Sequence, residues 1–156
     1  MNEIQVFFDT NVLVYAHDEA AVYHNSSARL LAMALEGKFQ GLIAEQNIVE
    51  LYRIITNRTA MRGNALTATA AINLINAVYL AGGFQIIYPT RSSIDKVLQL
   101  AAEGGFVSAR IFDVRLATLV LDAAVDYFAT YNISDFHGIA GLNPLTPEQI
   151  LTVLLT

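Results

Sequence analysis

Residues 4–16 read IQVFFDTNVLVYA, and this stretch decides the class of fold. Its first part, residues 4–8, is a short and mostly apolar run, which is typical of a strand buried on both faces of a parallel sheet. Asp9, Thr10 and Asn11 follow at once, and such short polar side chains favour turns and helix N-caps. We therefore predict a buried strand that ends in an acidic turn.

Strands and helices alternate along the rest of the chain. Further strands are expected at residues 41–44, 84–88 and 125–130. Helices are expected at residues 24–38, 46–57 and 67–80, from a cap at Ser92 or Ser93 to about Glu103, from Asp113 to about Ala124, and after the Thr146 cap. This alternation implies parallel pairing through right-handed crossovers. Without a repeat or a linker, we expect residues 1–156 to form a single α/β domain.

The composition excludes several classes of protein. A hydrophobic fraction of 54% suits a large buried core, but no apolar run approaches the roughly 20 residues needed to cross a bilayer. The N-terminal residues MNEIQVFF lack the basic region of a signal peptide. The absence of cysteine removes disulfides and thiolate metal sites and fits a reducing compartment. We expect a cytoplasmic protein with no membrane contact.

Four acidic residues stand where a parallel sheet would gather them: Asp9, Glu50, Asp113 and Asp135. Asp9 and the segment 130–135 follow strands, and ligands of such sheets bind beyond the carboxyl ends of the strands. Glu50 lies on a helix among apolar residues, where a Glu is rarely buried unless it is paired or metal-bound. Clustered carboxylates repel one another, and hard divalent cations such as Mg²⁺ compensate for that repulsion.

Each acid also has a structural explanation, and these alternatives stay open. Asp9 can cap a helix, Asp113 can complement a helix dipole, and Asp135 can form an Asx turn. The net charge of −5 argues against broad electrostatic adhesion to nucleic acid. The three histidines lack the spacing of a His-based metal motif, and no P-loop, dinucleotide-binding or nucleophile-elbow motif is present.

Several segments together resemble the PIN-domain family of metal-dependent ribonucleases, especially the toxins of bacterial and archaeal toxin–antitoxin pairs. The segments are FDTNVLVYA with Asp9, NIVELYRI with Glu50, IFDVRLATLVL with Asp113, the T-x-N-x-x-D-F pattern at residues 130–136, and a terminal TPEQIL. The resemblance implies a three-layer α/β/α domain with a central parallel sheet of four or five strands. It also implies a carboxylate pocket that binds Mg²⁺ or Mn²⁺.

The same resemblance implies roles for individual residues. The metal ligands and catalytic residues would be Asp9, Glu50, Asp113 and Asp135. The supporting polar positions would be Thr10, Asn11, Thr130 and Asn132. Arg115 follows Asp113 closely in the sequence and is our candidate for binding a substrate phosphate. Family toxins often have Ser or Thr at the start of the Glu-bearing helix; here Ala44 precedes Glu45, which predicts a poorer cap.

The expected activity is metal-assisted hydrolysis of RNA that leaves a 5′-phosphate. The expected partners are a small antitoxin and a second copy of the chain, with helices 24–38 and 67–80 as candidate surfaces. Two alternatives remain. A haloacid-dehalogenase-like phosphatase would use Asp9 as a nucleophile, although that family has D-x-D where this chain has Asn11. A non-catalytic PIN-like binding module would keep the fold without the chemistry.

Overall fold

The computed structural model describes residues 3–156, and five parallel strands form its central sheet in the order β3-β2-β1-β4-β5. The strands are β1 (Gln5–Phe8), β2 (Gln40–Ala44), β3 (Gln85–Ile87), β4 (Tyr127–Ala129) and β5 (Pro144–Leu145). Strands β2 and β3 are added in turn on one side of β1, and β4 and β5 are added in turn on its other side. The strand order therefore switches between β1 and β4, where such sheets bind their ligands.

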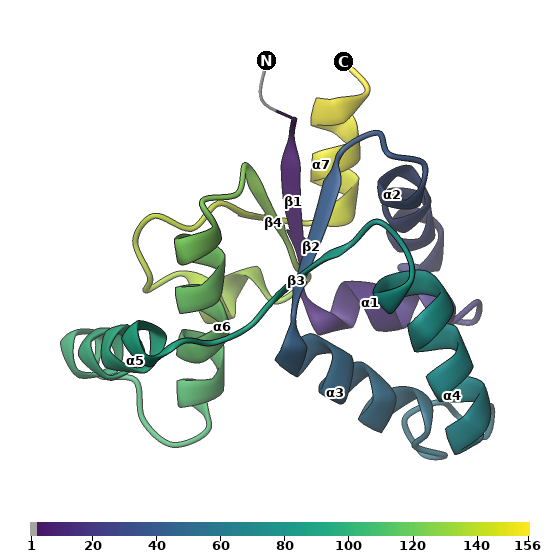
Figure 1. The fold of residues 1–156 in the computed structure, drawn as a ribbon, viewed down its shortest axis with the longest axis horizontal. Helices are drawn as coiled ribbons and strands as arrows, with labels where there is room; N and C mark the ends of the chain where they lie inside the picture. The colour runs from purple at the N-terminus through teal and green to yellow at the C-terminus, as the bar shows by residue number, and fades with distance from the viewer. Residues whose placement is uncertain (1–2) are drawn as a thin grey trace.

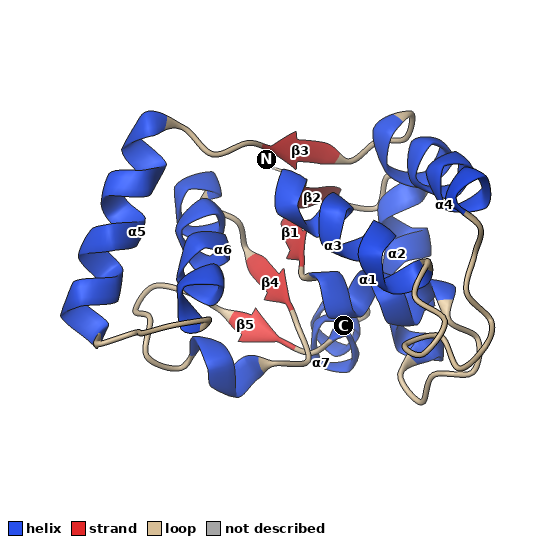
Figure 2. Ribbon diagram, turned by 90° about the horizontal axis from the view of Figure 1, so that it is seen from below, coloured by secondary structure: helices blue, strands red, loops and turns tan. Residues whose placement is uncertain are grey.

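Helices cover both faces of the sheet, which confirms the three-layer α/β/α arrangement (Figures 1 and 2). One face carries α1 (Thr10–His17), α2 (His24–Leu35), α3 (Glu45–Ile55), α4 (Ala68–Ile75) and α7 (Pro147–Leu154). The other carries α5 (Arg91–Gly104) and α6 (Arg110–Ala123). A π-helical segment η1 (Asn76–Leu80) and a 3-10 turn η2 (Ile133–Phe136) complete the set. Within residues 3–156, no helix is long and apolar enough to cross a membrane.

The apolar run of β1 is explained by burial on both faces of the sheet. Val6 and Phe8 belong to the core beneath α1 and α2, whereas Phe7 belongs to the core beneath α6. All three are completely buried. Full burial of a large apolar side chain contributes roughly 1.5–3 kcal/mol, so this strand anchors both halves of the core. Asp9, which follows this strand directly, therefore lies at the edge of both halves of the core.

Some element boundaries differ from the predicted ones. The helix expected over residues 67–80 is α-helical only to Ile75 and continues as η1. The predicted cap at Ser92 or Ser93 is wrong, because Thr90 is the N-cap of α5 and donates its backbone N–H to Ser93 Oγ at 3.0 Å. Helix α6 begins at Arg110, so Asp113 lies within its first turn and does not open it.

Gly41 in β2 packs against an aromatic ring and predicts a sharp size limit. A Cβ at this position would lie 2.7 Å from Cε1 of Phe84, whose buried ring contacts Phe8 and Tyr79 at centroid distances of 5.4 and 5.2 Å. Because that ring cannot shift freely, we expect Gly41→Ala to lower the free energy of unfolding by about 1–3 kcal/mol. Gly83→Ala, with open space around its Cβ, should change it by less than about 0.5 kcal/mol. Urea denaturation of both variants provides the comparison, and equal midpoints would contradict it.

Candidate active site

Three of the four predicted acids line one cavity of about 260 Å³ at the carboxyl end of β1. Four segments contribute side chains to this cavity: the first turn of α1, helix α3, helix α6 and the loop after β4. The lining residues are Asp9, Thr10, Asn11, Gln46, Glu50, Ile54, Phe112, Asp113, Leu116 and Asn132. Asp9, Glu50 and Asp113 are therefore brought together from segments far apart in the sequence.

Asp9 is almost completely buried, and both of its carboxylate oxygens are held. Oδ1 accepts the backbone N–H of Thr10 at 2.7 Å, and Oδ2 accepts the hydroxyl of Thr130 at 2.8 Å and the amide of Asn11 at 3.2 Å. The first contact also makes Asp9 the N-cap of α1, so its structural explanation holds beside any functional one. The predicted supporting residues Thr10, Asn11 and Thr130 all contact this carboxylate.

The electrostatic environment of Asp9 disfavours its charge. Burial raises the pKa of Asp9 to about 6, and the negative charges of Glu50 and Asp113 add to the rise. The hydrogen bonds from Thr130 and Thr10 favour the ionised form and oppose the shift only in part. A carboxylate in this state gains more than an ordinary one from a nearby cation.

Glu50 is also oriented through both oxygens. Its Oε2 accepts the hydroxyl of Thr10 at 2.9 Å, and its Oε1 accepts the amide of Gln46 at 3.1 Å. The fully buried Asn47 donates to Thr10 Oγ1 at 2.9 Å, and its own carbonyl accepts the backbone N–H of Ala44 at 2.8 Å. Asn47 thus fills the reciprocal half of a capping box, which offsets the missing side-chain oxygen at Ala44.

Thr10 joins Glu50 to Asn47, and we expect its hydroxyl to matter for stability. Thr10→Val would remove the donor to Glu50 and leave a buried Asn47 N–H without a partner, which lowers the free energy of unfolding by about 1–3 kcal/mol. Thr10→Ser keeps the hydroxyl and serves as the matched control. Urea denaturation without metal measures both, and equal losses in the two variants would show that the methyl group, not the hydroxyl, carries the effect.

Asp113 lines the cavity opposite Glu50, and Arg110 joins it to the backbone of Asp135. Arg110 donates Nε–H to Asp113 Oδ2 at 3.1 Å and an η-amino N–H to the backbone carbonyl of Asp135, with its guanidinium carbon 4.9 Å from the ring centroid of Phe106. Burial raises the pKa of Asp113, the charge of Asp135 raises it further, and Arg110 opposes both.

Three of the predicted site residues lie outside the cavity lining: Thr130, which contacts Asp9 from within the protein, Asp135 and Arg115. The carboxylate of Asp135 acts on Asp113 through its charge but does not line the cavity, and neither does Arg115, which lies half-buried on α6. Arg110, three residues before Asp113, is an arginine that directly contacts the acidic residues. Asn132 lines the cavity as expected, and its backbone N–H donates to Thr130 Oγ1 at 3.0 Å.

The donors around the cavity suit a hard divalent cation. All are oxygen-bearing or amide side chains, which match Mg²⁺ or Mn²⁺ better than a soft metal. No three Asp, Glu or His side chains within residues 3–156 converge closely enough to hold an ion alone. Mg²⁺ usually takes one or two carboxylates and keeps several waters, so this spacing still fits it. The amide nitrogen of Gln46 donates to Glu50, whereas its buried Oε1 has no hydrogen-bond partner within the protein.

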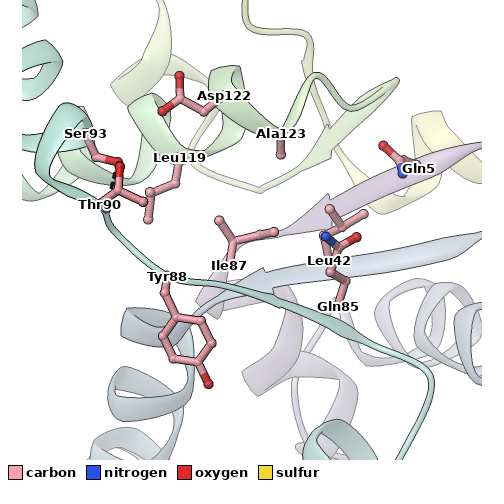
Figure 3. Close-up of a pocket in the computed structure, with 10 residues that line it drawn as sticks. All are labelled: Gln5, Leu42, Gln85, Ile87, Tyr88, Thr90, Ser93, Leu119, Asp122 and Ala123. Carbon is pink, nitrogen blue, oxygen red and sulfur yellow. Dashed lines mark hydrogen bonds between the residues drawn. The ribbon is translucent and has the colours of Figure 1, made fainter.

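A larger cavity of about 390 Å³ lies elsewhere, between the sheet and helices α5 and α6. Figure 3 shows Asp122, Thr90 and Ser93 on one side of it and the amides of Gln5 and Gln85 on another, so its polar groups do not converge. The carboxylate of Asp122 is already paired with Lys96. The candidate chemistry therefore belongs to the smaller acidic cavity.

Comparison with known proteins identifies the family. The family model described as the PIN domain matches residues 5–134. The chain therefore belongs to the PIN-domain family. It is 28% identical over 128 residues to Ribonuclease VapC24 of Mycobacterium tuberculosis. The aligned region covers 82% of this chain and 86% of that relative.

Solved structures share the fold at low sequence identity. A crystal structure of Mycobacterium tuberculosis VapC20, a toxin that cleaves the sarcin–ricin loop, superposes with a TM-score of 0.66 at 15% identity and covers 91% of this chain and 99% of that one. VapBC2 from Rickettsia felis, bound to a DNA fragment from its promoter, has a TM-score of 0.63 at 15% identity, with 92% and 98% covered. VapBC-1 from nontypeable Haemophilus influenzae has a TM-score of 0.60 at 14% identity, with 93% and 99% covered.

Proposed function

We propose that this protein is a metal-dependent endoribonuclease and the toxin of a toxin–antitoxin pair. The observation that carries the proposal is the meeting of Asp9, Glu50 and Asp113 in one cavity at the switch point of the sheet. Membership of the PIN-domain family and similarity to Ribonuclease VapC24 support the same reaction class. A cytoplasmic location accompanies this role.

The proposed ligands are Asp9, Glu50 and Asp113, with Asp135 acting from the rim. A bound Mg²⁺ or Mn²⁺ would lower the pKa of a coordinated water and neutralise charge on the transferring phosphate. The chain itself supplies orientation: Thr130 and Asn11 hold Asp9, while Thr10 and Gln46 hold Glu50. Hydrogen bonds of this kind keep both carboxylates aimed before substrate arrives.

Two arginines are candidates for the substrate phosphate. Arg110 already lies against Asp113 and stacks on Phe106, so its guanidinium is positioned beside the cavity. Arg115 remains the second candidate, five residues or about 1.4 turns further along α6. Arginine suits this task because its planar fork binds phosphate oxygens in pairs.

An antitoxin has an apolar surface on which to dock. A groove of about 290 Å³ runs between α3 and α4 with η1, and its lining residues are Ile48, Val49, Tyr52, Ile72, Ile75, Asn76 and Leu80. Val49, Ile72 and Leu80 are each about half or more exposed. Val49 lines this groove and its neighbour Glu50 lines the acidic cavity, so the two sites lie on different sides of α3. The complexes VapBC2 and VapBC-1 support a partner of this kind, and the exposed Ile94 and Leu98 of α5 offer a separate surface for a homodimer.

The test is incubation of the purified protein with single-stranded RNA oligonucleotides, with Mg²⁺ or with EDTA. Endonucleolytic products that carry a 5′-phosphate, formed only with metal, are the expected result. The phosphatase alternative predicts an acyl-phosphate on Asp9 that can be trapped. It is disfavoured because both oxygens of Asp9 already accept hydrogen bonds from within the protein. A binding module without catalysis would leave every RNA intact under both conditions.

A further inference from the structure

Three tyrosines pack together next to the acidic cavity. Tyr15 lies on α1, Tyr23 is the N-cap of α2, and Tyr131 follows β4. The rings of Tyr23 and Tyr131 are stacked, with centroids 4.2 Å apart and planes inclined by 23°. Tyr15 contacts both, at 5.6 Å from Tyr23 and 5.4 Å from Tyr131. Three separate segments therefore build one aromatic cluster.

The cluster is joined to the catalytic acid through a single residue. The backbone N–H of Tyr131 donates to Asn11 Oδ1 at 3.1 Å, and the amide of Asn11 donates to Asp9 Oδ2. Tyr15 lies four residues after Asn11 on α1, a rise of about 6 Å along the helix. Tyr131 thus connects the cluster to the side of the cavity that Asn11 and Asn132 line.

Hydrogen bonds hold the inner ring of the cluster in place. The hydroxyl of Tyr131 donates to Glu148 Oε1 at 2.8 Å and accepts the hydroxyl of Ser27 at 3.4 Å. Tyr131 and Tyr15 are half-buried, whereas Tyr23 is 45% exposed. A fixed ring thus supports an outer ring that keeps access to solvent.

We propose that Tyr23, supported by Tyr131, stacks on an unpaired base of the substrate beside the phosphate that is cleaved. This inference rests on the proposed ribonuclease function and adds single-stranded RNA as the substrate form. Proteins read unpaired RNA by stacking its bases on aromatic side chains, and such stacking tolerates every base. An aromatic cluster joined to the cavity-lining Asn11 through Tyr131 provides that contact.

RNA fits this surface better than a protein partner does. The most exposed ring of the cluster is Tyr23, with the exposed Val22 beside it. A stable protein interface buries about 800 Å² on each side, which one ring and one small side chain do not approach. The groove between α3 and α4 is the larger apolar surface.

The test combines protein variants with abasic substrates. Tyr23→Ala, Tyr23→Phe and the control Tyr88→Ala are compared with the unaltered protein on an RNA oligonucleotide that it cleaves; Tyr88 is 60% exposed and lines the other cavity. A scan of single abasic positions then locates the stacked base. We expect Tyr23→Ala to raise KM about tenfold with kcat little changed, and Tyr23→Phe and Tyr88→Ala to leave both near their original values.

The decisive measurement is whether the effects of Tyr23→Ala and of an abasic position on KM depend on each other. One abasic position near the scissile phosphate should raise the KM of the unaltered protein about tenfold and cause no further rise in Tyr23→Ala. Unchanged KM in Tyr23→Ala, or additive effects at every position, overturns the proposal, and so does loss of antitoxin binding with RNA kinetics intact. The scan on unaltered protein is independent of any folding defect. If the unaltered protein cleaves no RNA at all, the proposed function fails first and this inference falls with it.

Discussion

Asp9→Asn is expected to abolish RNA cleavage and yet to stabilise the metal-free protein at pH 7. Loss of activity follows because the substitution removes a negative charge from the centre of the cavity while keeping nearly the same shape. We expect a decrease in cleavage rate of at least about 10³-fold, in line with the several kcal/mol that a catalytic metal contributes to the transition state. The gain in stability follows from the burial of the same carboxylate.

The sign of the stability effect can be derived from the pKa of Asp9. Its folded value of about 6 lies above its ordinary value of 3.8, so the folded state favours the protonated acid. Stability from this group is therefore present at low pH and is lost as pH rises from about 4 to about 6. At pH 7 the ionised form costs about 3 kcal/mol relative to acid conditions. Asn lacks the charge but weakens the contact with Asn11, so we expect a net gain of about 1–2 kcal/mol.

Urea denaturation with EDTA at pH 7 and pH 5 measures this effect. The difference in the free energy of unfolding between Asp9→Asn and the unaltered protein should narrow by about 1 kcal/mol at pH 5, because most of the folded Asp9 is then protonated. Asp95→Asn makes the same chemical change at an exposed position of α5 and should follow the unaltered protein at both pH values. A destabilised Asp9→Asn at pH 7 would contradict the burial argument.

Much of the fold could be predicted because its strands are continuous apolar runs. The runs at residues 4–8, 84–88 and 125–130 contain β1, β3 and β4, and the run at 41–44 covers all of β2 except its first residue, Gln40. Strand β5 has only two residues, one of them Pro144, and carries no periodic pattern from which it could be read. The start of α6 was missed because its N-cap, Ala109, has no polar side chain that signals a helix terminus.

The sequence predicted that Asp9, Glu50 and Asp113 lie close together, but not the contacts that orient them. Asp9 and Glu50 stand out because each is an acid in an apolar setting. Asn47 contacts Thr10 across 37 residues of sequence, and no local pattern reports such a pair. Arg110 and Arg115 flank Asp113 almost symmetrically in sequence. Because α6 begins at Arg110, that residue lies three positions before Asp113 on the same helix and contacts its carboxylate.

Mg²⁺ is expected to stabilise the protein and to support cleavage that EDTA abolishes. Burial, together with repulsion from neighbouring carboxylates, raises the pKa values of Asp9 and Asp113, and a cation in the cavity offsets both effects. At a free metal concentration 100 times its dissociation constant, binding adds about 2.7 kcal/mol to stability. For a domain of this size, that gain raises the melting temperature by roughly 5–10 °C.

This stabilisation should depend on pH in a defined direction. Metal ligands must be deprotonated, so Mg²⁺ competes with the proton on Asp9 below pH 6, and its apparent affinity should fall about tenfold between pH 7 and pH 5. Thermal melts over a range of Mg²⁺ concentrations at pH 5, 6 and 7 measure this dependence without any RNA. Asp113→Asn should lose most of the Mg²⁺-induced rise, and Asp95→Asn should retain it. An equal rise in all three proteins would place the bound ion outside the acidic cavity, because only a site built from Asp9 and Asp113 couples metal affinity to both residues.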